Sequence, residues 1–220
     1  MHTIISISFS PFYLLPLILI FSIVGRTLLF RVRHFFSYTN YVWQETHPAV
    51  LSGIWLYGIT GGIIVLSSSS STSICRIHAI IILSFMLQMA VTDAVSGLLP
   101  ATFTRRFLIA GVLINITTDT WWTRTTETLI AAIILFCFHI ILNRRRPYIG
   151  TGDLWLIAGI TAWSGLYNAI WSVLLGLGGF VLWHSTWRIK RHIEGPLGPW
   201  ICIGHVLLLL DNLYQPLWVI

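Results

Sequence analysis

Gly150-Thr151-Gly152-Asp153 is followed by the apolar run Leu154-Trp155-Leu156-Ile157-Ala158, and three arginines, Arg144 to Arg146, come just before it. An aspartate at the start of an apolar helix is costly in a membrane unless it has a partner or a function. This stretch raises two questions: whether the chain crosses a membrane, and whether it supplies a partner for Asp153.

The composition is that of an integral membrane protein. Hydrophobic residues make up 56% of the 220-residue chain and charged residues only 9%, whereas soluble domains carry about 25% charged residues. Long apolar runs without a ten-residue alternation favour helices over a β-barrel. We therefore predict an all-α, polytopic membrane protein that forms one domain over residues 1–220.

Apolar runs predict about eight transmembrane helices, near residues 4–24, 49–66, 74–92, 107–118, 128–142, 154–163, 169–183 and 200–210. The first run is apolar before it is basic, the reverse of a signal peptide, and is predicted to be retained. With the N-terminus outside, every Lys and Arg except Arg76 and Arg124 lies in a cytoplasmic loop. This asymmetry follows the positive-inside rule and supports the orientation.

Other function classes find little support. The net charge of +6 comes from short loops between apolar runs, so it indicates topology rather than nucleic-acid binding. The three cysteines form no CxxC pair, so neither a zinc site nor any other metal or cofactor is predicted. His139, His205 and Asp211 lie in predicted spans, where packed polar residues are the simpler interpretation than the ion path of a small transporter.

A second aspartate complements Asp153. In the predicted topology Asp93 ends the third span and Asp153 begins the sixth, at the same cytoplasmic face and at similar depth. Two carboxyl groups close together in a low-dielectric site share a proton. One can then take a proton from water while the other polarises a peptide carbonyl, without a metal. Gly150 and Gly152 would give the backbone unusual freedom and let a substrate strand come close.

The residues alone leave two structural alternatives open. Aspartate is a favoured N-cap residue, so Asp153 could simply cap its helix. Asp93 could be a loop acid that pairs with Arg105 or Arg106.

Asp93-Ala-Val-Ser-Gly-Leu-Leu-Pro100, together with the GxGD motif Gly150–Asp153, resembles the type IV prepilin peptidase family. These polytopic GxGD aspartic proteases are the leader peptidases of type II secretion and type IV pilus systems. Trp163–Gly165, Gly176–Gly179 and Gly198–Trp200 match further landmarks of the family. The likeness covers about residues 91–204.

The resemblance implies that Asp93 and Asp153 are catalytic, that Gly150, Gly152 and Pro100 belong to the site, and that the peptidase core covers about residues 74–214. It implies a location in the bacterial inner membrane. The implied partners are the lipid bilayer and a prepilin or pseudopilin precursor with a basic leader and an apolar helix. Cleavage would follow a glycine at the cytoplasmic membrane face.

The sequence departs from the family at several points. Ala101 follows Pro100 where many members have aspartate, and Trp155 stands where many have lysine. No cytoplasmic domain with CxxC pairs lies between the first two predicted spans, so a short form with peptidase activity and no zinc-binding domain is expected. The alternative is a degenerate, non-catalytic relative that acts in pilus or secretion-system assembly.

Overall fold

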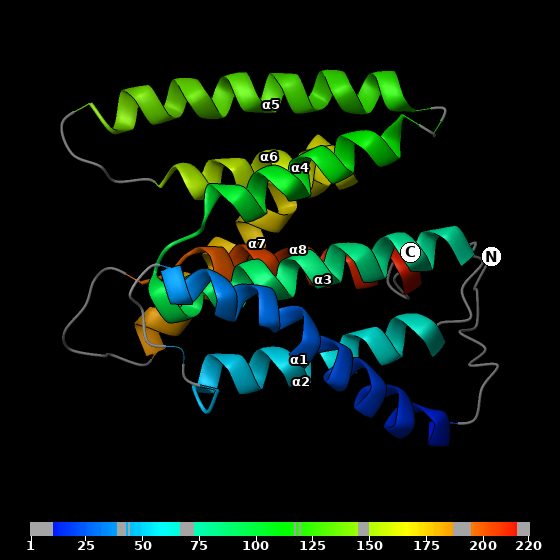
Figure 1. The fold of residues 1–220 in the computed structure, drawn as a ribbon. Coiled ribbons are helices and arrows are strands. Elements are labelled where there is room, and N and C mark those ends of the chain that lie inside the picture. The colour runs from blue at the N-terminus through cyan, green and yellow to red at the C-terminus, as the bar shows by residue number, and fades with distance from the viewer. Residues whose placement is uncertain are drawn as a thin grey trace. The chain divides into compact units, whose positions relative to one another are not determined.

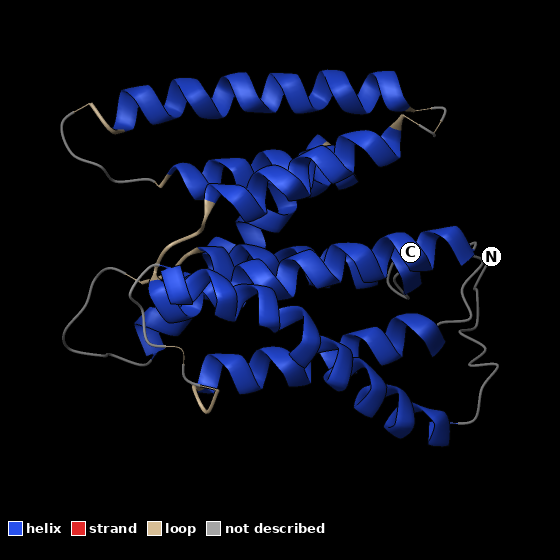
Figure 2. Cartoon of the chain, viewed as in Figure 1, coloured by secondary structure: helices blue, strands red, loops and turns tan. Residues whose placement is uncertain are grey.

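A computed structural model describes residues 11–38, 43, 45–66, 73–116, 118, 120–144, 150–186 and 195–214. Within these ranges the regular secondary structure is helical throughout (Figure 2). A 3₁₀ helix at Pro11–Tyr13 leads into α1 (Leu14–Tyr38), and α2 (Pro48–Leu66), α3 (Ser73–Ser96) and α4 (Ala101–Asn115) follow. The remaining helices are α5 (Trp121–Leu142), α6 (Thr151–Ser164), α7 (Leu166–Thr186) and α8 (Gly198–Tyr214).

Five of these helices are long and apolar enough to cross a membrane: α1, α2, α3 from Cys75 onward, α5 to Ile141, and α7. The all-α, multi-pass character of the chain is therefore confirmed. Helices α4, α6 and α8 coincide with the other predicted spans but have only 15, 14 and 17 residues. The count of eight membrane crossings and the outside N-terminus stay predictions.

Two helices continue through basic residues at which the predicted spans ended or began. The first span was predicted to end at Val24, yet α1 continues through the basic residues 26–34 to Tyr38. Arginine has a high helix propensity and this segment holds no proline or glycine, so nothing stops the helix there. Likewise Arg105 and Arg106 lie inside α4. Residues 67–72 of the serine-rich segment and the basic residues 188–192 lie outside the described residues.

The chain forms two compact units, residues 1–91 with 206–220, and residues 92–205. In the first unit α1 packs along α2, and the side chains of Leu29, Val32, Tyr57 and Ile64 are buried there. The prediction of one domain stays a prediction.

Helix α6 lies at the centre of the second unit, in contact with α4, α5 and α7 (Figure 1). Leu156 and Ile160 of α6 are fully buried. The indole Nε1 of Trp163 donates a hydrogen bond to the carbonyl of Phe107 in α4 at 2.9 Å, and the two rings stack 5.8 Å apart. Gly165, with φ at +86°, separates α6 from α7, which begins at Leu166. These contacts hold α6, whose first turn carries Asp153, against α4.

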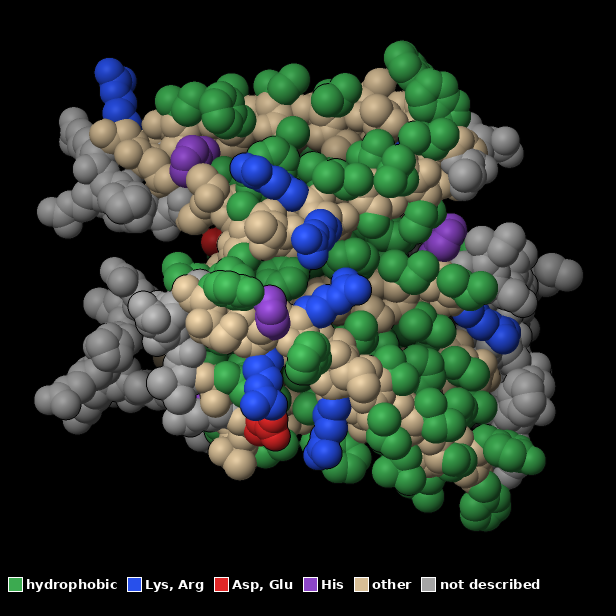
Figure 3. All heavy atoms as spheres, viewed as in Figure 1, with side chains coloured by type: hydrophobic (Ala, Val, Ile, Leu, Met, Phe, Trp, Pro, Cys, Tyr) green, Lys and Arg blue, Asp and Glu red, His purple; other side chains and the backbone are tan. Residues whose placement is uncertain are grey.

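Helix α5 presents a hydrophobic surface on the face visible in Figure 3. Its exposed apolar side chains are Leu129, Ile130, Ile133, Ile134, Phe136, Phe138, Ile140 and Ile141. A surface of this kind is expected of a helix that faces lipid.

Candidate active site

Asp93 lies one turn before the end of α3, and its side chain is only 4% exposed. Gly97 ends the helix with φ at +65°, and its N–H donates to the carbonyl of Asp93 at 2.7 Å. A left-handed residue directly after a helix is the usual position for glycine, because other residues are strained there. The sequence around Asp93 thus stops the helix just after the acid.

The carboxyl group of Asp93 accepts a hydrogen bond from the backbone N–H of Gly198, at 2.9 Å from Oδ2. Gly198 is the first residue of α8, where backbone N–H groups lack helical partners and the helix dipole favours negative charge. A Cβ at this position would stand 2.7 Å from Oδ2 of Asp93. A residue larger than glycine at position 198 would therefore block both the close approach of α8 to Asp93 and the hydrogen bond between them.

Pro100 is the N-cap of α4, in extended conformation with φ at −65° and ψ at 128°. Its carbonyl accepts hydrogen bonds from the N–H groups of Phe103 and Thr104, at 3.0 and 3.3 Å. The proline therefore turns the chain from the end of α3 into α4.

Asp153 lies in the first turn of α6, outside the five helices long enough to span a membrane, and is half-buried. Burial raises the pKa of the Asp153 carboxyl to about 6, and the negative charge of Asp93 raises the pKa as well. No hydrogen-bond donor to this carboxyl is found among the described residues. The fold thus brings the two predicted acids, from α3 and α6, near enough for the charge of Asp93 to raise the pKa of Asp153.

The geometry argues against both structural alternatives. The N-cap of α6 is Gly150, three residues before Asp153, and no side chain caps this helix. Asp93 forms no ion pair with Arg105 or Arg106, and its carboxyl bonds to Gly198 instead. Neither acid is explained by local helix structure.

Gly150 and Gly152 lie in conformations that any residue can adopt. Gly150 has φ at −70°, and Gly152 is helical and buried. A Cβ on Gly152 would collide with the carbonyl oxygen of Leu99 and stand 2.8 Å from its Cβ. The small size of Gly152 therefore lets α6 pack against the chain's own segment between α3 and α4. Room for a substrate at these glycines stays a prediction.

Trp155 contacts a cation of the neighbouring helix. The guanidinium of Arg105 in α4 lies over the indole ring, 5.4 Å from its centre. This distance is within the range of a cation–π interaction. A basic group thus lies beside Trp155, although the residue at this position is not itself basic.

His205 is packed rather than solvated, as predicted, and is 1% exposed. Its Nδ1 lies 2.9 Å from Oγ of Ser172 and its Nε2 lies 3.3 Å from Oγ of Ser164. Ser172 donates its own proton to the carbonyl of Asn168, so the Nδ1 of His205 must carry the proton toward Ser172. This network ties α8 to α6 and α7. His139 bonds to Asn143 one turn along its own helix.

Sequence reasoning missed two glycines of the site. Gly198 was recognised only as a landmark, because its contact with Asp93 joins residues 105 positions apart. The cap at Gly97 had a local signal that was not used, namely a glycine at the end of an apolar helical run.

The fold and the two acids define a class: a helical membrane protein in which carboxyl groups from two helices approach each other in one unit. Residues 80–183 match the model of the type IV leader peptidase family. Through this region the chain is similar to that family, and the resemblance predicted from its motifs is confirmed.

The relatives carry the name prepilin leader peptidase/N-methyltransferase. One from Burkholderia pseudomallei (strain K96243) is 34% identical over 134 residues, which cover 54% of this chain and 41% of the relative. One from Pectobacterium carotovorum subsp. carotovorum is 30% identical over 146 residues, 61% of this chain and 51% of the relative. The chain thus spans about half the length of the curated relatives it matches. No solved structure matches the chain.

Proposed function

We propose that the protein is a membrane-embedded aspartic endopeptidase that removes the leader of type IV prepilin-like precursors. The observation that carries the proposal is the placement of Asp93 and Asp153 in one compact unit and within the family match, with the charge of Asp93 raising the pKa of Asp153. The relatives' name supports the substrate class. The proposal covers the peptidase reaction and leaves methylation aside, because the sequence has no CxxC pair.

The two carboxyl groups take different roles in this mechanism. Asp93 accepts a hydrogen bond from the backbone N–H of Gly198 at the N-terminus of α8, so its carboxyl has a fixed donor. Asp153 is raised in pKa to about 6 and receives no hydrogen bond from the described residues, so it carries the shared proton. Asp93 is then the base and Asp153 the acid.

The reaction needs one water and no covalent enzyme intermediate. Asp93 takes a proton from the water as its oxygen attacks the scissile carbonyl, and Asp153 gives its proton to the carbonyl oxygen. The tetrahedral species then collapses, and the proton held by Asp93 passes to the leaving amine. Asp153 recovers its proton from the hydroxyl of the collapsing species, so the pair returns to one shared proton.

The proposed substrate is a prepilin or pseudopilin precursor with a basic leader followed by an apolar helix, cut after a glycine. The proposed location is the bacterial inner membrane, with the cut at the cytoplasmic face. The positive-inside distribution of the basic residues supports this face, because it predicts both acids on the cytoplasmic side.

Asparagine variants of each acid test the dyad. Asp93→Asn and Asp153→Asn are expected to lower precursor cleavage in membranes by about 10³-fold or more, because each removes a proton-transfer group. Asp211→Asn, in the same chain but outside the second unit, serves as the matched control and should keep the wild-type rate. Processing retained by either site variant would refute the dyad.

The wild-type chain separates this proposal from the non-catalytic alternative. A folded, membrane-inserted chain that processes no prepilin-like precursor encoded beside it would favour an assembly role. Cleavage that depends on both aspartates would exclude that role as the sole function.

A further inference from the structure

The first unit contains two adjoining pockets between α1 and α2. One has a cavity volume of about 200 Å³ and the other of about 240 Å³. Arg26, Leu51 and Ile54 line both pockets, so the two are continuous. We call this feature the α1–α2 groove. Its lining is completed by Leu19, Ser22, Ile23, Leu29, Phe30, Arg33, Trp43, Glu45, Val50 and Trp55.

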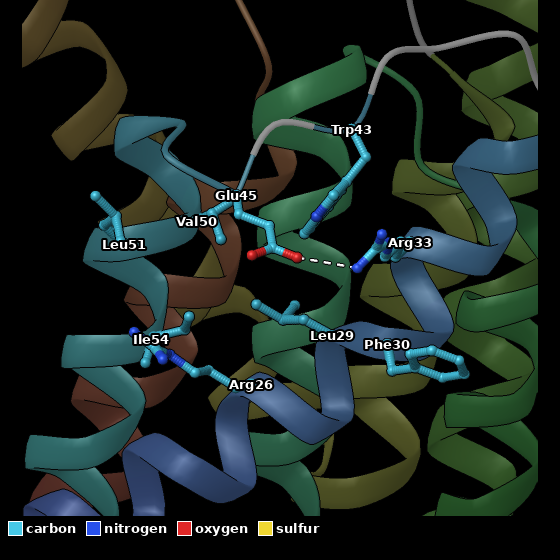
Figure 4. A pocket seen from close by; sticks show the side chains of 9 residues that line it. All are labelled: Arg26, Leu29, Phe30, Arg33, Trp43, Glu45, Val50, Leu51 and Ile54. Atoms are coloured by element: carbon cyan, nitrogen blue, oxygen red, sulfur yellow. Dashed lines mark hydrogen bonds and ion pairs between the residues drawn. The ribbon is translucent and has the colours of Figure 1, made fainter.

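The groove is polar at one end and apolar at the other. Arg33, Trp43 and Glu45 lie at the polar end (Figure 4), whereas Leu19, Ile23 and Trp55 line the other pocket. Three apolar side chains of that pocket are open to the surroundings of the helix pair, with exposed fractions of 60% for Leu19, 64% for Ile23 and 56% for Trp55. An amphipathic groove on a helix surface of this kind suits a ligand with a polar head and an apolar tail.

The charges of the groove favour an anion at Arg26. Arg33 pairs with Glu45 at 3.0 Å, and both side chains are exposed. Arg26 has no acidic partner among the described residues, and Figure 4 shows it beside Ile54, apart from the Arg33–Glu45 pair. The lining therefore carries one net positive charge, that of Arg26, between the polar and the apolar pocket.

An arginine inside a spanning helix needs an anionic partner or contact with the headgroup region. Arg26 lies within α1, one of the five helices long and apolar enough to span a membrane. Guanidinium matches the geometry of phosphate, and tryptophan favours the membrane interface, as Trp43 would at the polar end. Basic pockets between membrane helices bind anionic lipid headgroups in this way.

We propose that the α1–α2 groove is a binding site for an anionic phospholipid, with the phosphate on Arg26 and an acyl chain along Leu19, Ile23 and Trp55. The inference concerns the first unit alone and holds whether or not the protein is a peptidase. Glu45 disfavours an anion at the far polar end, which leaves Arg26 as the phosphate contact. A basic peptide is disfavoured by the same charge balance.

Lipid-induced thermal stabilisation of the full chain in detergent micelles tests the site. Phosphatidylglycerol should raise the unfolding temperature of the wild type in a saturable manner, whereas phosphatidylcholine should not. In Arg26→Gln the half-saturating concentration of phosphatidylglycerol should rise about fivefold, the equivalent of one arginine–headgroup contact. Arg31→Gln is the matched control, because Arg31 is exposed on the same helix but does not line the groove.

Two soluble probes separate the headgroup from the chain. Inorganic phosphate and glycerophosphoglycerol lack an acyl chain and should stabilise the protein far less than phosphatidylglycerol. The proposal is overturned if Arg26→Gln and Arg31→Gln respond alike, if phosphatidylcholine stabilises equally, or if glycerophosphoglycerol is as effective as the lipid.

Discussion

Glycines let helices approach closely in both units, and the atoms that a new Cβ would meet differ from one glycine to the next. In the first unit a Cβ on Gly61 would meet the ring of Phe21, and a Cβ on Gly62 would meet the side chains of Leu14 and Ile18. In the second unit a Cβ on Gly152 would meet the carbonyl of Leu99. A side chain can rotate away from a new methyl group, whereas backbone cannot without moving its helix.

Helices α7 and α8 also approach each other through backbone atoms. A Cβ on Gly176 would stand 2.8 Å from Cα of Ile201, and one on Gly204 would collide with the carbonyl of Ser172. Backbone atoms are therefore the nearest neighbours at Gly152, Gly176 and Gly204 of the second unit. Gly61 and Gly62 of the first unit face side chains, and Gly58 faces both a side chain and the backbone of α1.

Among the glycine positions, the largest effect is expected at Gly198, whose N–H bonds to the carboxyl of Asp93. Gly198→Ala would push a methyl group into the carboxyl of Asp93 and break the hydrogen bond from α8. A hydrogen bond to a charged group contributes about 1.5–3 kcal/mol, so precursor cleavage should slow about 10- to 100-fold. Cleavage rates in membranes at equal protein levels measure this.

Gly178→Ala is the matched control for Gly198→Ala. A Cβ on Gly178, an exposed residue of α7, meets nothing within 4 Å. Its cleavage rate should equal that of the wild type. A wild-type rate in Gly198→Ala would instead show that the hydrogen bond to Asp93 does not set the rate.

Gly152→Ala and Gly62→Ala compare the units directly. Overpacking costs about 1–3 kcal/mol, and Gly152→Ala should fall at the upper end because the Leu99 backbone blocks the methyl group. At Gly62 the nearest side-chain atom, of Leu14, would be 3.2 Å away and can move. Alanine also gains about 0.5–1 kcal/mol over glycine in a helix, so Gly62→Ala should be nearly neutral.

Thermal unfolding in detergent distinguishes the two glycine variants. A clearly lower unfolding temperature for Gly152→Ala alone would support the distinction between backbone and side-chain neighbours. Equal decreases in the unfolding temperature of the two variants would contradict that distinction.

The protonation of Asp153 makes the stability of the second unit depend on pH. Its carboxyl has a pKa of about 6 in the folded protein, above the ordinary value of 3.8, so the folded state holds the proton more tightly. Stability conferred by the protonated form is therefore lost as the pH rises from about 4 to 6. Asp153→Asn should remove this loss.

Unfolding measured at pH 4.5 and at pH 8 tests the role of Asp153. Above pH 6 the asparagine variant should be more stable than the wild type by about 2 kcal/mol, after allowance for the lost helix-dipole interaction. At the lower pH the two proteins should differ much less. A variant less stable than the wild type at pH 8 would contradict the raised pKa.

Much of this architecture followed from the sequence, because its signals are local. Apolar runs predicted the positions of the eight α-helices in the described part of the chain. Gly165, which belongs to the Trp163–Gly165 landmark, ends α6. The end of α1 was missed because charged residues stop a membrane span without stopping a helix. The bond of Gly198 to Asp93 and the fit of Gly152 to Leu99 are long-range contacts, which no local pattern contains.

The smallest effects are expected at the charged surface contacts, one in each unit. Arg105 lies over Trp155 in the second unit, and Arg33 pairs with Glu45 in the first. Exposed cation–π contacts contribute about 0.5–1 kcal/mol and exposed ion pairs about 0–1 kcal/mol. Double-mutant cycles with Arg105→Gln and Trp155→Leu, and with Arg33→Gln and Glu45→Gln, should give similarly small coupling energies. High salt should weaken the Arg33–Glu45 coupling more, because both partners are ions. A coupling energy well above 1 kcal/mol at Arg105 would mean that charge, and not only backbone packing, holds α4 against α6 beside Asp153.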